Sequence, residues 1–156
     1  MIYPQKCAPD WIVGFTDAEG HFSIIQSRNK IRCRFIISQN ARSIHALYAI
    51  KDYFGVGHVN CAGGKMYAYT VGNLNDIYDK IIPFFEKYTL HSNKYFDWLL
   101  FRHALEAQKN RSSHNLFRAK LIKKKDSITL QNQIESLLQT GSSAFVMERL
   151  VLRYLL

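Results

Sequence analysis

Two carboxylates, Asp17 and Glu19, stand two positions apart directly before Gly20. The apolar spacing around them predicts a short helix over about 10–19, capped by Asp10 and ended at Gly20. The helix dipole disfavours an anion at this end, so neither carboxylate is there to stabilise the helix. A lone carboxylate can serve as a ligand for Mg²⁺, which binds few protein groups and keeps several waters. The alternative is a surface acid beside a helix-ending glycine.

Basic residues outnumber acidic ones, with 21 Lys and Arg against 12 Asp and Glu and a formal net charge of +9. Such an excess attracts polyanions, most often nucleic acid and sometimes anionic lipid. No acidic residue lies between Glu19 and Asp52.

Residues 30–35 alternate between basic and apolar types, which predicts a strand with one basic face. The basic face would carry Lys30, Arg32 and Arg34, and the core face Ile31, Cys33 and Phe35. A β-ribbon of this kind fits the DNA major groove, where Arg and Lys pair with guanine edges. The alternative is an ordinary solvated sheet face.

Other chemistries have weaker support in the sequence. The three cysteines are odd in number and far apart, which indicates reduced thiols in an intracellular protein and no structural zinc site. The six histidines do not form a paired metal motif on one helix. The sequence shows no signal peptide and no apolar run that reaches roughly 18 residues, so no membrane partner is expected.

The elements that position these residues follow from periodicity. Residues 21–39 alternate as two strands joined near 27–29, and Ser43 is predicted to cap a helix that ends at Gly55. A second hairpin is expected from 56–59 and 66–71.

Asn73 or Asn75 is predicted to cap the next helix, which Pro83 should disturb, and Ser92 to start a longer one. Two more helical patterns cover 116–138 and 144–154. The fold class is therefore α+β, in the order αββαββα, with additional C-terminal helices. We expect a single domain over 1–156, with its core over about 10–109 and a helical region over about 115–156.

Gly14 and Ala18 lie four residues apart, on one face of the first predicted helix. Small residues at this spacing let a second backbone approach closely. If this helix packs against its own copy, two Glu19 side chains converge.

The segment WIVGFTDAEG at 11–20 resembles the signature of the LAGLIDADG homing endonucleases, with Glu in place of the commoner last Asp. The single copy resembles the dimeric branch of that family. The resemblance extends to FIISQ at 35–39, GVG at 55–57 and LHSNKYFDW at 90–98, and so covers about 10–109.

The resemblance implies a saddle-shaped antiparallel sheet and a metal-dependent site. Glu19 and the backbone carbonyl of Ala18 would hold the metal against a scissile phosphate. Lys94 and Gln39 would line the site around the attacking water. The expected cofactor is Mg²⁺ or another divalent cation such as Mn²⁺, with Ca²⁺ supporting binding without efficient cleavage.

The resemblance also assigns two surfaces. The candidate DNA-contacting residues are His21, Ser23, Ile25, Ser27, Arg28, Lys30, Arg32, Arg34, Ser38, His58, Asn60 and Lys65. The candidate dimer interface consists of Trp11, Gly14, Phe15 and Ala18.

The expected function is that of a homodimeric, site-specific endonuclease in intron homing, which cuts double-stranded DNA at a pseudo-palindromic target. We expect an organelle gene product, in a mitochondrion or chloroplast, with a prokaryotic cytoplasm as the alternative. Two other functions fit the same scaffold: an intron RNA-binding maturase and a non-cleaving DNA-binding protein. Strand breakage that depends on a divalent metal separates the first function from the other two.

Overall fold

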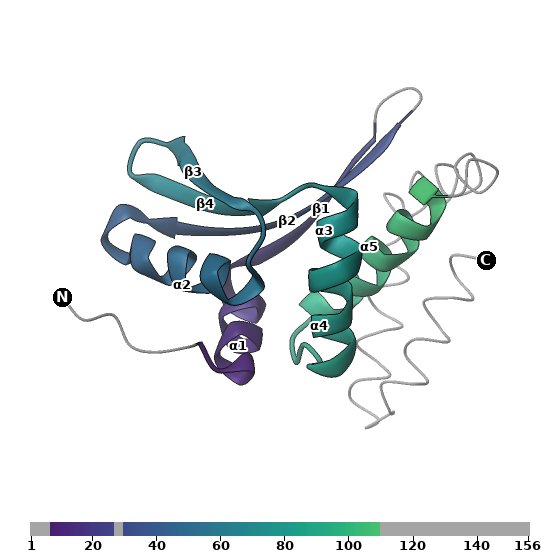
Figure 1. Ribbon diagram of the computed structural model, residues 1–156, viewed down its shortest axis with the longest axis horizontal. Coiled ribbons are helices and arrows are strands. Elements are labelled where there is room, and N and C mark those ends of the chain that lie inside the picture. The colour runs from purple at the N-terminus through teal and green to yellow at the C-terminus, as the bar shows by residue number, and fades with distance from the viewer. Residues whose placement is uncertain (1–6, 27–29, 110–156) are drawn as a thin grey trace. The chain divides into compact units, whose positions relative to one another are not determined.

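The computed structural model describes residues 7–26 and 30–109, shown as the coloured ribbon in Figure 1. The chain divides into two compact units, Met1–Leu105 and Glu106–Leu156. The helical patterns predicted over 116–138 and 144–154 lie outside the described residues, as does the loop at 27–29.

Four antiparallel strands form one sheet in the order β1-β2-β4-β3. Their bounds are β1 Gly20–Gln26, β2 Ile31–Asn40, β3 His58–Gly63 and β4 Met66–Val71. Phe22 of β1 pairs with Phe35 of β2, and Ile37 pairs with Tyr69 of β4. The predicted α+β class and the order αββαββα are confirmed.

Helix α1 spans Pro9–Glu19, but the predicted Asp10 cap is wrong. Ala8 occupies the capping position without a side-chain hydrogen bond, and proline stands at the start of the helix. The first helical position suits proline because its N–H would have no partner there. The capping position therefore lies two residues earlier, at Ala8, than the sequence pattern indicates.

Helix α2 spans Ile44–Phe54 and follows a single 3₁₀ turn, Ala41–Ser43. The cap belongs to that turn, where the side chain of Asn40 accepts a hydrogen bond from the Arg42 N–H at 3.2 Å. Ser43 occupies the capping position of α2 as predicted, but its side chain makes no capping hydrogen bond. Gly55 ends α2 as predicted, with a left-handed φ of 69°.

The next helical segment consists of α3 Leu74–Asp76, a π turn Ile77–Ile81 and α4 Ile82–Lys87. Asn73 caps it, as one of the two predicted candidates. Pro83 does not end the helix, because it stands in the first turn of α4, just after the π turn. A missing N–H is tolerated at a helix start. Helix α5, Lys94–Lys109, is the longer helix predicted from Ser92 onward.

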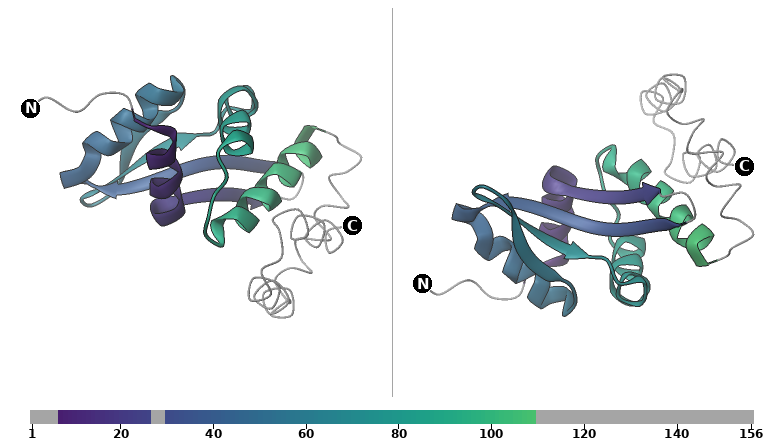
Figure 2. Two further views of the ribbon diagram at one scale, coloured as in Figure 1. Left: turned by 90° about the horizontal axis from the view of Figure 1, so that it is seen from below. Right: turned by 90° about the horizontal axis from the view of Figure 1, so that it is seen from above.

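The helices all lie on one face of the sheet (Figure 1). From below they cross over the strands, whereas from above the strands lie in front (Figure 2). Phe22 links the two layers, since its ring lies 5.3 Å from both Phe35 and Phe101 and 5.6 Å from Trp98. Within the described ranges, no helix combines the length and the apolar character that crossing a membrane requires.

Candidate functional site

Glu19 is an exposed residue at the last position of α1, where the chain turns directly into β1. Ile12, Val13 and Thr16 anchor the helix from its buried side. The helix ends at Gly20 as predicted, and this glycine is extended, with φ −78°. A Cβ on Gly20 would lie 2.5 Å from Thr16 Cγ2 and 2.6 Å from the Thr16 carbonyl oxygen. Glycine is therefore required for space, and the tight turn places Glu19 at the edge of the sheet.

The donors at this helix end fit a hard divalent cation. Carbonyl groups in the last turn of a helix have no partner within the helix and carry its negative dipole end. Ala18 and Glu19, both exposed, therefore offer a carbonyl oxygen and a carboxylate. No cluster of three His, Cys, Asp or Glu side chains occurs among residues 7–26 and 30–109. This donor set suits a cation that completes its shell with phosphate oxygens and waters.

Lys94 lies beside the same helix end, although it is 74 residues away along the chain. Its Nζ donates a hydrogen bond to the Gly20 carbonyl oxygen at 2.6 Å, in a partly buried position. The structure thus brings a cation to the residue next to Glu19.

Asp17, which was not assigned a role from the sequence, binds the segment that leads into α5. Its carboxylate accepts hydrogen bonds from the backbone N–H groups of His91 at 2.9 Å and Ser92 at 3.1 Å, and from the Ser92 hydroxyl at 2.6 Å. Burial acts to raise the pKa of Asp17, but these hydrogen bonds and nearby His91 outweigh it, so the pKa is lowered. The sequence signal was its position two residues before Glu19.

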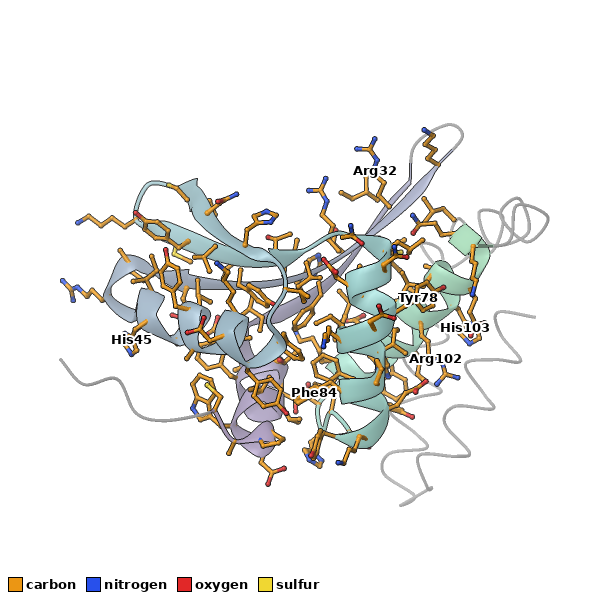
Figure 3. The ribbon with its side chains drawn as sticks, in the orientation of Figure 1. Arg32, His45, Tyr78, Phe84, Arg102 and His103 are labelled. Carbon is orange, nitrogen blue, oxygen red and sulfur yellow. The ribbon has the colours of Figure 1, made fainter. Side chains whose placement is uncertain are left out.

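The face of the sheet opposite the helices carries the predicted basic residues. Arg32 is exposed and Arg34 is half-buried, whereas Ile31, Cys33 and Phe35 are buried, so the predicted alternation is confirmed. Figure 3 shows Arg32 on the helix-free side and Phe84 among the helices. The four described strands contain no acidic residue.

Cross-strand register arranges the open face in rows. His21 pairs with Ile36, Ile36 with Thr70, and Thr70 with His58. The neighbouring pairs are Ser23 with Arg34 and Ile25 with Arg32 on one side, and Ser38 with Ala68 and Ala68 with Asn60 on the other. The strand residues predicted to contact DNA therefore lie on one continuous surface. We call it the open face.

The remaining predicted DNA contacts lie outside the strands. Lys30 directly precedes β2, Lys65 lies in the turn between β3 and β4, and both are exposed. Ser27 and Arg28 lie outside the described residues.

Gln39 lies on the other face of β2. It pairs with Tyr67, and its strand alternation matches that of buried Ile37. Among the described residues, no hydrogen bond joins it to Glu19 or Lys94. Gln39 thus lies on the helix-covered face, the side of the sheet on which α1 and α5 also lie. The structure brings Lys94 to the helix end that carries Glu19, and the catalytic role of Gln39 stays a prediction.

One side of α1 is uncovered in the described part of the chain. Trp11 is 42% exposed and its ring stacks on that of Phe15, with 4.9 Å between the ring centroids. Gly14 and Ala18 are exposed, and a Cβ on Gly14 would meet nothing within 4 Å. The predicted interface residues thus share one accessible helix face.

The chain is similar to known proteins in sequence. Residues 12–105 match the family model described as LAGLIDADG endonuclease. The chain is 34% identical over 103 residues to a probable intron-encoded endonuclease 2 of Neurospora crassa, covering 65% of this chain and 23% of that protein. It is 51% identical over 43 residues to an uncharacterized mitochondrial protein RF1 of Saccharomyces cerevisiae, covering 28% of this chain and 9% of that protein. The chain thus spans about a quarter or less of these relatives.

A solved structure has the same fold. I-SmaMI bound to an uncleaved DNA target in the presence of calcium ions superposes with a TM-score of 0.66 at 28% identity. The match covers 71% of this chain and 40% of that one.

Proposed function

Because the chain belongs to the LAGLIDADG endonuclease family, we propose that it is a site-specific double-strand DNA endonuclease of intron homing. The observation that carries the proposal is the juxtaposition at the end of α1. The exposed Glu19 carboxylate stands there, and the Lys94 ammonium binds the carbonyl oxygen of the next residue, Gly20. The four described strands of the adjoining sheet contain no acidic residue.

The open face provides the DNA-binding surface in this proposal. The major groove admits a two-stranded β-ribbon. Basic side chains on one side of the ribbon are attracted by the negative charge of the DNA phosphates. I-SmaMI, which has the same fold, was solved on a DNA target. By this analogy β1 and β2 lie in the groove, and Lys30 and Lys65 reach phosphates at the ends of the hairpins.

Glu19 and the Ala18 carbonyl would hold Mg²⁺ or Mn²⁺, and Ca²⁺ would support binding without efficient cleavage. A bound divalent cation supplies charge neutralisation at a phosphate and activates a water. Lys94 Nζ, held at Gly20, donates hydrogen bonds to the phosphate or to the attacking water. Gln39, on the helix-covered face of β2 where α1 and α5 also lie, would line the site around the attacking water.

One such site cuts one DNA strand, so double-strand cleavage needs a second site. We propose that the uncovered face of α1 packs against a second α1, supplied by another copy of this chain. Gly14 and Ala18 allow the close approach, and two Glu19 residues then meet near the symmetry axis. A two-fold assembly reads a pseudo-palindromic target.

The relatives' names support an intron-encoded product of a mitochondrion, since one is called intron-encoded and another mitochondrial. Strand breakage that depends on a divalent metal distinguishes this function from a maturase that binds intron RNA and from a non-cleaving DNA-binding protein.

The test uses a randomised duplex library, with cut ends sequenced after incubation in Mg²⁺ or Mn²⁺. Glu19→Gln removes the charge that binds the metal but keeps the side-chain shape. Cleavage should disappear, while affinity for a selected target in Ca²⁺ changes by less than about tenfold.

Asp10→Asn is the matched control, because Asp10 is an exposed acid at the other end of the same helix. It should cleave at the wild-type rate. Full cleavage by Glu19→Gln in Mg²⁺ would falsify the assignment of Glu19. A wild-type protein that binds the library but never cuts it contradicts the proposed activity.

A further inference from the structure

Asp17 connects two segments that are far apart in sequence. Its Oδ2 accepts the His91 N–H, and its Oδ1 accepts both the N–H and the hydroxyl of Ser92. His91 and Ser92 lie between the end of α4 and the start of α5. With three donors on its two oxygens, this carboxylate serves as a structural acceptor, a role different from that of exposed Glu19.

Ser92 passes this connection on to α5. While its hydroxyl donates to Asp17, its Oγ also accepts the Lys94 backbone N–H at 3.1 Å. The Ser92 carbonyl accepts the Tyr95 N–H at 3.0 Å. A hydroxyl that accepts an N–H from the first turn is the usual N-terminal cap of a helix. The position of Ser92 therefore sets where α5 begins.

Lys94 makes the second contact between the start of α5 and the end of α1. It is the first residue of α5, and its side chain returns to α1, where Nζ meets the Gly20 carbonyl oxygen at 2.6 Å. Asp17 and Gly20 thus hold the start of α5 on both sides of Glu19. A free lysine side chain samples many rotamers, and holding its backbone and its ammonium removes that freedom.

We infer that Asp17 is a positioning residue, which fixes Lys94 beside the metal-binding carboxylate by clamping Ser92. This inference rests on the proposed role of Lys94 in cleavage. The carboxylate is chemically required, because an asparagine in its place has one acceptor oxygen and one donor NH₂ group. If the oxygen of that amide keeps Ser92, the NH₂ group faces the His91 N–H, so two donors oppose each other.

The experiment is a double-mutant cycle between Asp17→Asn and Lys94→Ala, read as single-turnover cleavage of a library-selected target. Asp17→Asn should slow cleavage by about tenfold to a hundredfold, as the loss of a supporting hydrogen bond does at other sites. The affinity of the variant for the target in Ca²⁺ should change by less than about threefold, because Asp17 is not among the proposed DNA contacts. The double variant should be no slower than Lys94→Ala alone, because Asp17 acts through Lys94.

Ser92→Ala removes the hydroxyl that donates to Asp17 and should also slow cleavage. Ser92→Thr keeps that hydroxyl and should retain more of the cleavage rate. Asn93→Ala is the control in the same loop, since it changes an exposed residue between Ser92 and Lys94. Thermal unfolding of each variant identifies any that fails to fold. Rate losses that multiply in the double variant, or a wild-type rate for Asp17→Asn, overturn the inference.

A readout without activity separates this inference from the proposed function. The His91 and Ser92 amides should be protected from hydrogen exchange, and Lys94 side-chain protons should show a nuclear Overhauser effect to Gly20. Both signals should weaken in Asp17→Asn. If they persist there, the positioning role is wrong whatever the activity. If they weaken but the wild type cuts no DNA, the proposed function fails and the clamp stands.

Discussion

At the scale of single residues, the site depends on how abruptly α1 stops. Thr16 is fully buried beneath the turn, and Gly20 lies against it with no room for a Cβ. The same turn exposes Glu19 and offers the Gly20 carbonyl oxygen to Lys94. A small change at either residue should therefore affect both stability and chemistry.

Gly20→Ala should destabilise the fold, because its methyl group would lie 2.5 Å from Thr16 Cγ2 and 2.6 Å from backbone. The expected cost is about 1–3 kcal/mol in the free energy of unfolding, the usual range for overpacking. The cleavage rate should fall by more than the loss of folded protein accounts for, since relief of the clash moves Glu19 and the Gly20 carbonyl. Chemical denaturation and single-turnover cleavage measure the two effects. A variant with wild-type stability contradicts the steric account of this glycine.

Thr16→Val should leave the fold as stable or make it more stable, by up to about 1 kcal/mol. The Thr16 hydroxyl is buried and has no hydrogen-bond partner in the described part of the chain. Valine has the same shape without the polar atom. Thr16→Ser is the control that keeps the hydroxyl and loses the methyl group, and it should be less stable. Denaturant midpoints compare the three proteins, and a clear loss for Thr16→Val indicates an unseen partner for the hydroxyl.

At the scale of elements, strand alternation separates recognition from the core. Along β2 each buried residue is followed by one on the open face, and helices cover the buried side. Burial raises the pKa of the Cys33 thiol to about 12, which makes it a core group and not a nucleophile. Arg34 lies near Gly72, where an added Cβ would be 3.6 Å from its Cγ. The Arg34 stem is thus better supported than that of exposed Arg32.

Arg32→Ala and Arg34→Ala should each relax the preference at one target position per half-site, at a cost of about 1–3 kcal/mol. Cleavage of a library of single-substituted targets measures the preference at each position. Lys80→Ala is the control, because Lys80 is an exposed basic residue on the π turn. Its loss should change no position preference. If both arginine variants keep wild-type affinity and preference, the open face does not read the target.

Sequence reasoning succeeded where one short-range pattern decides the structure. The alternation around Arg32 fixed the faces of β2, and Gly55 marked the end of α2. It failed where neighbours compete for the same role, as at Asn40 and Ser43 before α2. Contacts across 74 residues, such as that of Lys94 with Gly20, have no local signal. The resemblance proposed Lys94, but only the fold reveals the hydrogen bonds of Asp17 to His91 and Ser92.

At the scale of the whole molecule, the uncovered side of α1 is the surface through which we propose that the chain assembles. Trp11 and Phe15 stack beside two small residues, Gly14 and Ala18, on a helix face with no cover in the described ranges. Close helix contacts use small residues of this kind, flanked by larger ones. The proposed second α1 would cover this apolar strip and bring the second Glu19 into place.

Gly14→Leu should prevent that contact without harming the single chain. A side chain at this position meets nothing within 4 Å, and leucine favours a helix over glycine by about 1 kcal/mol. The isolated chain should therefore stay folded, while the dimer and double-strand cleavage are lost. Sedimentation, free and on a target, measures assembly, with Gly14→Ala as the milder control. An unchanged sedimentation profile for Gly14→Leu, or a wild-type monomer on DNA, contradicts pairing through this face.

The one-sided cover of the sheet also affects how such a protein can change over generations. Residues such as Ile25, Ser23 and Thr70 have their side chains on the open face, so substitutions there leave the buried face of each strand untouched. Glu19 and Lys94 are carried by helices, outside those strands. Under the proposed function, mutations there would alter the preferred target while the scaffold, Glu19 and Lys94 stay intact. A lineage built this way would follow a drifting host sequence, or move to a new locus, through single viable steps.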